Sequence, residues 1–210
     1  YAKNPGAVVP GFEAPDFDTS GWDDIRVPAH IQLEGYDRPQ YANVQYPWDG
    51  HETLEPGQAP RLFNPVGSYV TSFPLDEPLA DGERLSVSFK GAESAIAVWL
   101  NGRYIGYSQI SHSSSEFDVT DHLVGGTNRL AVLVLKWGVG TYLEDQDKFR
   151  SSGIIRDVYL LERPHSAVFD YFTTTTLGPL GASVSVRASF LGSPTAATVI
   201  IADATGATIA

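Results

Sequence analysis

The sequence predicts an all-β protein built on an antiparallel β-sandwich, and two observations carry this prediction. Twenty glycines and fourteen prolines punctuate the 210 residues, and between them lie short runs rich in Val, Ile, Thr, Tyr and Phe. No stretch sustains the apolar repeat of about 3.6 residues that marks an amphipathic helix. We therefore expect consecutive short strands, little helix, and one full sandwich domain with room for part of a second.

Six runs are predicted strands, and their spacing is typical of an antiparallel sandwich. They cover residues 68–75, 83–89, 95–100, 103–108, 129–137 and 153–162. In the second run, Leu85, Val87 and Phe89 alternate with polar residues, which indicates one buried face. The run 129–137 is apolar at both alternating sets, so we expect a central strand covered on both sides. The predicted interior includes Val87, Val98, Val132 and Val158.

The clearest local signal is the dipeptide Asn101-Gly102, which lies between two apolar-rich runs. Both residue types tolerate the positive φ angles of a type I′ turn, so a β-hairpin is predicted here. We interpret the two residues as turn chemistry rather than as part of a binding site.

Two segments are too long to be ordinary connections, whose median length is roughly 4–6 residues. Residues 28–65 hold many prolines and aromatic residues, and this aromatic content favours ordered coil over disorder. Residues 138–152 join two strongly apolar strands. Long ordered loops on a rigid β scaffold often carry function, so we expect the functional residues in these two segments.

The composition changes after Pro164, where charged side chains become rare and Thr, Ala and Ser become frequent. We expect a domain boundary there, with one domain over residues 1–164 and a second, incomplete domain over 165–210. The runs 167–177, 182–191 and 196–202 are predicted strands of the second domain. Three strands are too few for an independent sandwich.

The formal charge of −11 excludes partners that need clustered Lys and Arg. Nucleic acids and anionic lipid surfaces are such partners, so we expect neither nucleic-acid nor membrane binding. No run approaches the ~20 apolar residues of a transmembrane span. The chain has no cysteine, which excludes disulfides and thiolate metal sites, and it has no methionine, so we expect its translational start upstream.

An acidic cluster in the second long segment consists of Glu144, Asp145 and Asp147. A retaining glycosidase needs two carboxyl groups facing each other about 5–5.5 Å apart, and neighbours on one loop rarely meet that requirement. Two interpretations remain open at this point. The carboxylates are part of a solvated loop, or they bind a sugar hydroxyl or a hard cation such as Na⁺, Mg²⁺ or Ca²⁺.

Asn43 is the candidate binding residue in the first long segment, because its amide can donate and accept hydrogen bonds and it lies among aromatic residues. Sugars are bound by such a combination of amides and aromatic faces. The alternative is an asparagine that caps a turn. The five histidines show no metal-binding spacing, so we expect no histidine metal site.

The sequence resembles the N-terminal domain of the large bacterial β-galactosidases of glycoside hydrolase family 2 over residues 17–164. The resemblance rests on an ordered set of segments rather than on any one of them. They are Val27-Pro28-Ala29-His30, Gly35-Tyr36-Asp37-Arg38-Pro39, Tyr41-Ala42-Asn43-Val44-Gln45-Tyr46-Pro47, Gly67-Ser68-Tyr69, Trp99-Leu100-Asn101-Gly102, Ser115-Glu116-Phe117-Asp118, Asn128-Arg129-Leu130-Ala131-Val132, Tyr142-Leu143-Glu144-Asp145-Gln146-Asp147 and Ser152-Gly153-Ile154-Ile155-Arg156-Asp157-Val158.

This resemblance implies a jelly-roll, galactose-binding-like sandwich at residues 1–164, the start of an immunoglobulin-like β-sandwich at 165–210, and a barrel with two catalytic glutamates outside this chain. It implies that Asn43 and Asp147 contact the galactose of a β-galactoside such as lactose, and that Asp147 also ligates Na⁺. It further implies Mg²⁺ in the full enzyme without ligands from this chain, a cytoplasmic location, a homo-oligomeric parent and no activity for this chain alone.

Two departures from the family pattern are visible, Ile31 and Phe149, where tryptophan is usual in both places. The family's Leu-Asn-Gly-x-Trp piece before residue 17 is also missing. Ile31 and Phe149 are still apolar, and neither departure changes Asn43 or Asp147. Two other functions stay open: a stand-alone carbohydrate-binding module, and a purely structural β-sandwich.

Overall fold

The computed structural model describes residues 1–144, 147–194 and 196–210. The chain forms two compact units, which are described separately. The first comprises residues 1–78 and 85–161, and the second comprises residues 79–84 and 162–210. In the described part of the chain, no helix is long enough and apolar enough to span a membrane.

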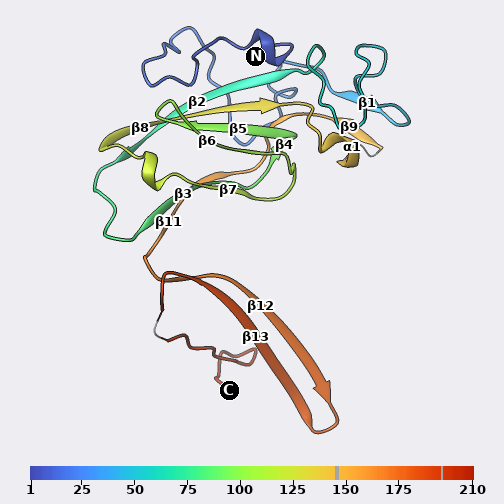
Figure 1. The fold of residues 1–210 in the computed structure, drawn as a ribbon. Helices are drawn as coiled ribbons and strands as arrows, with labels where there is room; N and C mark the ends of the chain where they lie inside the picture. Colours follow the sequence, from blue (N-terminus) through green and yellow to red (C-terminus); the bar gives the residue numbers. More distant parts are fainter. Residues whose placement is uncertain (145–146, 195) are drawn as a thin grey trace. The chain divides into compact units, whose positions relative to one another are not determined.

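The first unit is a two-layer antiparallel sandwich (Figure 1), which confirms the predicted all-β fold. One layer is a four-stranded sheet in the order β2-β8-β5-β6 and the other is a three-stranded sheet in the order β11-β3-β7. Their bounds are Val66–Leu75 (β2), Gly126–Leu135 (β8), Ala95–Leu100 (β5), Arg103–Ser108 (β6), Val158–Arg163 (β11), Arg84–Phe89 (β3) and Ser115–Asp118 (β7).

The core lies between these layers and contains three of the four valines predicted there. Val87 and Val98 are 0% exposed and Val132 is 2% exposed. Val158 is only half-buried, so its prediction as an interior residue is wrong. The reason is that β11 lies at the edge of its sheet, where Tyr159 and Leu160 are also exposed.

For two central strands, the burial predicted from the apolar pattern can be compared with the burial seen in the structure. β8 lies between β2 and β5 and is largely buried on both faces, as predicted from its double apolar pattern. β3 was expected to bury one face only, and this expectation is wrong because Ser86 and Ser88 are buried as well. Their small side chains fit the interior position of β3 between β11 and β7.

The β5–β6 hairpin confirms the predicted turn. Asn101 and Gly102 have φ angles of 51° and 78°, the two positive values that a type I′ turn requires. The Asn101 side chain also donates to the His122 carbonyl (2.9 Å) and accepts from the Arg129 amide (2.9 Å). The turn therefore also fixes β8 to the hairpin.

The second unit contains one long antiparallel hairpin, β12 (Ala167–Gly178) and β13 (Gly181–Leu191). The predicted third strand at 196–202 is wrong, because this run has only an isolated bridge between Ala202 and Thr208. The bridge closes a turn in which the Asp203 carboxylate accepts bonds from the amides of Thr205 and Ala207. The assignment of this unit to an immunoglobulin-like sandwich stays a prediction.

Short elements complete the first unit. They are the 3₁₀ turns Pro5–Ala7 (η1) and Thr120–His122 (η2), the strands Gln40–Ala42 (β1), Ala92–Glu93 (β4), Lys148–Arg150 (β9) and Gly153–Ile154 (β10), and the helix Thr141–Glu144 (α1). Pairing of β1 with β9 and of β4 with β10 connects the long segments to the sandwich.

Candidate functional site

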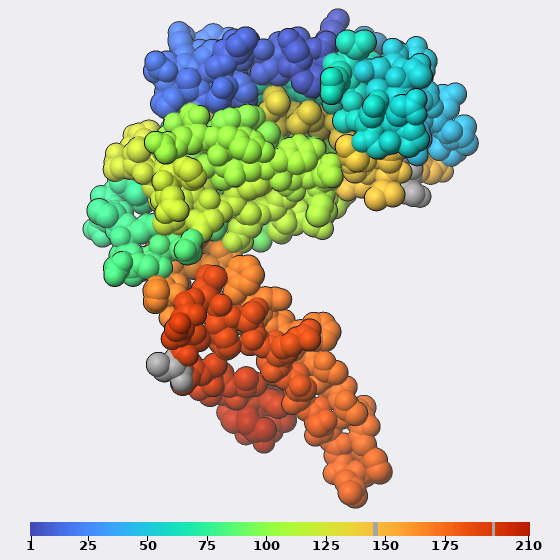
Figure 2. Space-filling model, viewed as in Figure 1, coloured from blue at the N-terminus to red at the C-terminus, as the bar shows by residue number. Residues whose placement is uncertain are grey.

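The two long segments singled out from the sequence meet in a two-stranded antiparallel ribbon, β1–β9. Figure 2 shows them side by side, with the first in blue to cyan and the second in yellow to orange. The register pairs residues 40, 41 and 42 with 150, 149 and 148. The pairing ends at Ala42 and Lys148, and Asn43 and Asp147 are the residues that directly flank this last pair. The structure thus brings together the two residues that sequence analysis had selected from segments about 100 positions apart.

A tyrosine hydroxyl connects these two residues. The Tyr41 hydroxyl donates a hydrogen bond to Oδ1 of Asp147, and the Asn43 side chain lies near enough to the same hydroxyl to affect its pKa. The bond to Asp147 raises the pKa of Tyr41, because it stabilises the protonated phenol, and the Asn43 contact opposes this shift. Both Asn43 and Asp147 are exposed. Their polar atoms therefore remain accessible to a ligand.

An aromatic cluster fixes the far sides of both segments. Tyr46 stacks on Trp48 with ring centroids 5.2 Å apart, and Tyr142 lies 4.8 Å from Tyr46 and 5.0 Å from Trp48. Such pairs each contribute about 0.5–1.5 kcal/mol beyond the burial of their surface. In sequence, Asn43 lies between β1 and Tyr46, and Asp147 lies between Tyr142 and β9. Each site residue is therefore flanked along the chain by the ribbon on one side and by this cluster on the other.

Glu144, the first residue of the predicted acidic cluster, has a structural role. Its carboxylate accepts hydrogen bonds from the Ser111 amide (3.2 Å) and the Ser111 hydroxyl, and its carbonyl accepts one from Arg150 Nη1 (3.1 Å). These bonds hold the end of α1 against the sandwich. Asp145 lies outside the described residues.

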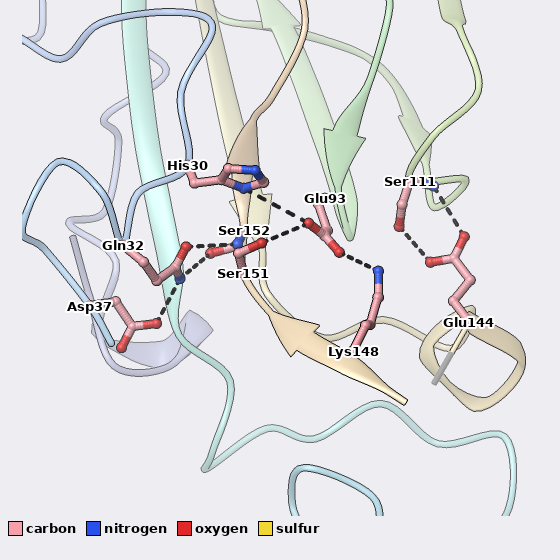
Figure 3. A network of polar contacts seen from close by, with 9 residues as sticks. All are labelled: His30, Gln32, Asp37, Glu93, Ser111, Glu144, Lys148, Ser151 and Ser152. Carbon is pink, nitrogen blue, oxygen red and sulfur yellow. Dashed lines mark hydrogen bonds and ion pairs between the residues drawn. The ribbon is translucent and has the colours of Figure 1, made fainter. Parts of the chain in front are cut away.

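Glu93 is the central anchor of β9, and sequence analysis missed it (Figure 3). Its carboxylate is buried and accepts from Lys148 Nζ at 2.7 Å and from the Ser151 hydroxyl at 3.1 Å, while His30 Nδ1 lies 4.0 Å away. The available signal was a lone carboxylate in the apolar run 92–100. Glutamate is almost never buried without a partner, so such a residue indicates a buried ion pair.

A second buried network fixes the segment before β1. The Asp37 carboxylate accepts from Lys136 Nζ (2.5 Å) and Gln32 Nε2 (2.9 Å). Gln32 Nε2 also donates to the Ser152 hydroxyl (3.0 Å), and the Ser152 amide donates to Gln32 Oε1 (2.9 Å). Figure 3 shows the bonds that Gln32 makes to Asp37 and Ser152. Burial alone would raise the pKa of Asp37, but the hydrogen bonds from Lys136 and Gln32 outweigh it and lower the pKa. Burial lowers the pKa of Lys136, which is 0% exposed, against the opposing effect of Asp37.

The described residues offer little for a metal ion beyond Asp147. Among them, no group of three His, Asp or Glu side chains lies close enough to hold one. Asp147 presents an exposed carboxylate, and oxygen is the donor that hard cations such as Na⁺ prefer. Its chemistry fits one ligand of such a cation, and a Na⁺ site at Asp147 stays a prediction. We find no donor set for Mg²⁺ among the described residues.

Three exposed apolar residues lie close to Asn43 and Asp147 in the sequence. Val44 is 91% exposed, Leu143 85% and Phe149 71%. Single exposed apolar residues are common, so the exposure of these three is notable only because they are close in sequence to the two candidate residues. Ile31, the other departure from the family pattern, is buried.

Comparison with known proteins shows which family the chain belongs to. The family model described as "Glycosyl hydrolases family 2, sugar binding domain" matches residues 13–164. The chain belongs to glycosyl hydrolase family 2. The matched range contains the whole β1–β9 ribbon and both layers of the sandwich.

Curated relatives within this family carry the name beta-galactosidase. The protein of Priestia megaterium is 46% identical over 177 residues (84% of this chain), that of Halalkalibacterium halodurans 49% over 170 residues (81%), and that of Streptococcus thermophilus 45% over 172 residues (82%). The chain spans only 17% of the length of each of these three relatives.

Solved structures of the family share the fold at lower identity. A beta-glycosidase from Bacteroides vulgatus matches with a TM-score of 0.69 at 18% identity, covering 98% of this chain and 25% of that protein. A family 2 member from Bacteroides cellulosilyticus matches with a TM-score of 0.63 at 20% identity, covering 96% and 26%. At these identities the likeness concerns the fold alone.

Proposed function

We propose that this chain is the N-terminal part of a β-galactosidase and supplies one wall of its sugar pocket. In this proposal Asn43 and Asp147 contact hydroxyl groups of the terminal galactose of a β-galactoside such as lactose. The observation that carries the proposal is the β1–β9 ribbon, whose last pair, Ala42 and Lys148, is directly flanked by the exposed residues Asn43 and Asp147. The family membership and the names of the curated relatives support it.

The chemistry of the two side chains suits a sugar. A carboxylate accepts hydrogen bonds only, an amide donates and accepts, and a sugar hydroxyl can satisfy both. The exposed apolar residues Val44, Leu143 and Phe149 lie nearby, and binding pockets usually combine a few polar groups with such apolar lining. We propose that the remainder of the parent chain covers this face and completes the pocket.

The reaction itself needs groups that we place outside this chain. Hydrolysis through a glycosyl-enzyme intermediate requires two carboxyl groups about 5–5.5 Å apart. Glu144 is bound to Ser111, so it is a poor candidate for either group. The contribution of this chain is orientation of the sugar ring against those carboxyl groups, where small misplacement is costly. Na⁺, with Asp147 as one ligand, would add a positive charge that binds a sugar hydroxyl oxygen.

The decisive experiment compares the complete gene product with the 210-residue chain. We expect the native protein to be several times larger by intact mass, to hydrolyse β-galactosides and to leave β-glucuronides intact. The 210-residue chain should be inactive and should bind free galactose weakly or not at all in calorimetry, because two contacts offset little of the entropy of holding a sugar.

Two other outcomes would replace the proposal. A micromolar dissociation constant of the 210-residue chain for galactose would favour a stand-alone carbohydrate-binding module. An active full-length enzyme whose galactoside kinetics do not change on substitution of Asn43 or Asp147 would favour a purely structural sandwich.

A further inference from the structure

Tyr41 is exposed, but it has an aromatic cross-strand neighbour and a hydrogen-bond partner. The residue is 57% exposed, and its ring centroid lies 5.7 Å from that of Phe149, its cross-strand partner in the β1–β9 ribbon. A side chain fixed at the backbone and at the ring has little freedom to redirect its terminal hydroxyl. This hydroxyl donates a hydrogen bond to Asp147, and the Asn43 side chain is near enough to affect its pKa.

The main effect of the hydrogen bond from Tyr41 is on the orientation of the Asp147 carboxylate. An exposed hydrogen bond competes with water, so its net contribution to stability is small. A carboxylate, however, has about four lone-pair sites, and a fixed donor at Oδ1 selects one rotamer of the Asp147 side chain. Among the described residues, Tyr41 is the hydrogen-bond partner that the structure gives to this carboxylate. The remaining lone pairs are left for a ligand.

We propose that Tyr41 is a positioning residue that aligns the Asp147 carboxylate, and with it the Asn43 amide, for an incoming sugar hydroxyl or cation. This inference rests on the proposed function, because it acts through the two residues assigned there. Its specific claim is that the effect of Tyr41 passes through Asp147. A residue that merely stabilises the ribbon would not show this dependence.

The test is a double-mutant cycle in the full-length enzyme with Tyr41→Phe, Asp147→Asn and the double variant. Tyr41→Phe keeps the ring against Phe149 and removes only the hydroxyl. We expect it to lower kcat/KM for a β-galactoside about 10-fold, as loss of a hydrogen bond to a charged group does. The double variant should be no worse than Asp147→Asn alone within about threefold, because coupled residues are not additive.

Two further readouts separate positioning from general damage. Calorimetry should give a weaker dissociation constant for galactose in Tyr41→Phe, and the Na⁺ concentration for half-maximal activity should rise several-fold. The matched control is Tyr159→Phe, because the Tyr159 hydroxyl also donates to an aspartate, Asp157, at 2.9 Å but lies on β11. In this control, kcat/KM, the dissociation constant for galactose and the half-maximal Na⁺ concentration should each stay within about twofold of the parent values.

The outcomes distinguish the two proposals. If Asp147→Asn impairs the enzyme while Tyr41→Phe is silent, or if the two effects simply add, the positioning role is wrong and the proposed function stands. If Asp147→Asn leaves galactoside kinetics unchanged, the assignment of Asp147 is wrong and the role of Tyr41 falls with it.

Discussion

The hydroxyl of Tyr41 donates a hydrogen bond to the carboxylate of Asp147, although 106 positions of sequence separate the two residues. Neither segment alone places a polar group with this accuracy, because each is mostly coil. The pairing of β1 with β9 supplies the missing order. The buried Glu93, and the ion pair of Asp37 with the buried Lys136, fix the ribbon to the sandwich. The site is therefore a property of two loops held together.

Replacing Asp147 with asparagine in the full-length enzyme keeps the shape of the side chain and removes its charge. We expect kcat/KM for β-galactosides to fall ~100-fold or more, as loss of a charge-assisted bond of roughly 3 kcal/mol implies. The dependence of the rate on Na⁺ should weaken as well. Steady-state kinetics over a series of NaCl concentrations, at constant ionic strength, measure both effects.

Asp145→Asn is the comparison for this substitution, although Asp145 lies outside the described residues. We expect it to change galactoside kinetics much less. If the two substitutions have equal effects, the acidic cluster is better interpreted as part of a solvated loop.

Lys148→Met removes the cation that neutralises the buried Glu93 carboxylate. Glu93 is 4% exposed, so the substitution leaves a buried charge with fewer partners, and we expect a loss of about 2–4 kcal/mol in the free energy of unfolding. Urea denaturation of the chain measures it. Lys3→Met, at an exposed position, should change stability by less than about 0.5 kcal/mol. Similar values for both variants would show that the Glu93–Lys148 pair does not anchor β9.

Asp37→Asn breaks the ion pair with the fully buried Lys136. We expect it to lower the free energy of unfolding by about 3–5 kcal/mol at pH 7. The pKa of Asp37 is lowered in the folded state, so its stabilising contribution is present above the unfolded pKa of about 3.9 and is lost as pH falls through the folded value. The difference between the parent chain and the variant should therefore shrink below about pH 4.

Urea denaturation at several pH values between neutrality and the acid range checks this prediction. Asp16→Asn, at an exposed position, is the control and should track the parent chain at every pH. A difference between parent and Asp37→Asn that stays constant on acidification would contradict the role of the Asp37 carboxylate.

Gly102→Ala tests the β5–β6 turn. Gly102 has a φ of +78°, and a Cβ there would lie 2.9 Å from Cδ of Pro15, so both backbone strain and crowding oppose alanine. We expect destabilisation of about 1–3 kcal/mol. Gly125→Ala is matched, since a Cβ at Gly125 meets nothing within 4 Å. Thermal unfolding should show a clearly lower Tm for the first variant, and equal Tm values would contradict the turn assignment.

The strands and the hairpin could be predicted from the sequence because their signals are local. The type I′ turn depends on Asn101 and Gly102 alone, and the central position of β8 is visible in its two apolar faces. The selection of Asn43 and Asp147 combined local chemistry with family resemblance. That these two residues lie close together could not be predicted, because it depends on two coil segments forming one ribbon. Neither segment shows this in its own sequence.

The wrong predictions share a physical cause, which is that an apolar pattern does not report what lies beside a strand. Val158 has the sequence context of a core residue, but its strand is at a sheet edge. The run 196–202 is apolar enough for a strand, but the turn around Asp203 brings its end back onto itself. Glu93 escaped prediction because its partners Lys148 and Ser151 lie about 55 positions later in the chain.

The separation of the two halves of the ribbon has a consequence during synthesis. Asn43 leaves the ribosome 104 positions (147 − 43) before Asp147. At roughly 5–20 residues per second, the first half waits about 5–20 s for its partner strand. Through that interval Tyr41 and Val44 lie on a segment with no second strand, exposed to other nascent chains and to chaperones. Chains arrested after β8 but before Asp147 would contain all four strands of the larger layer but would have no β1–β9 ribbon.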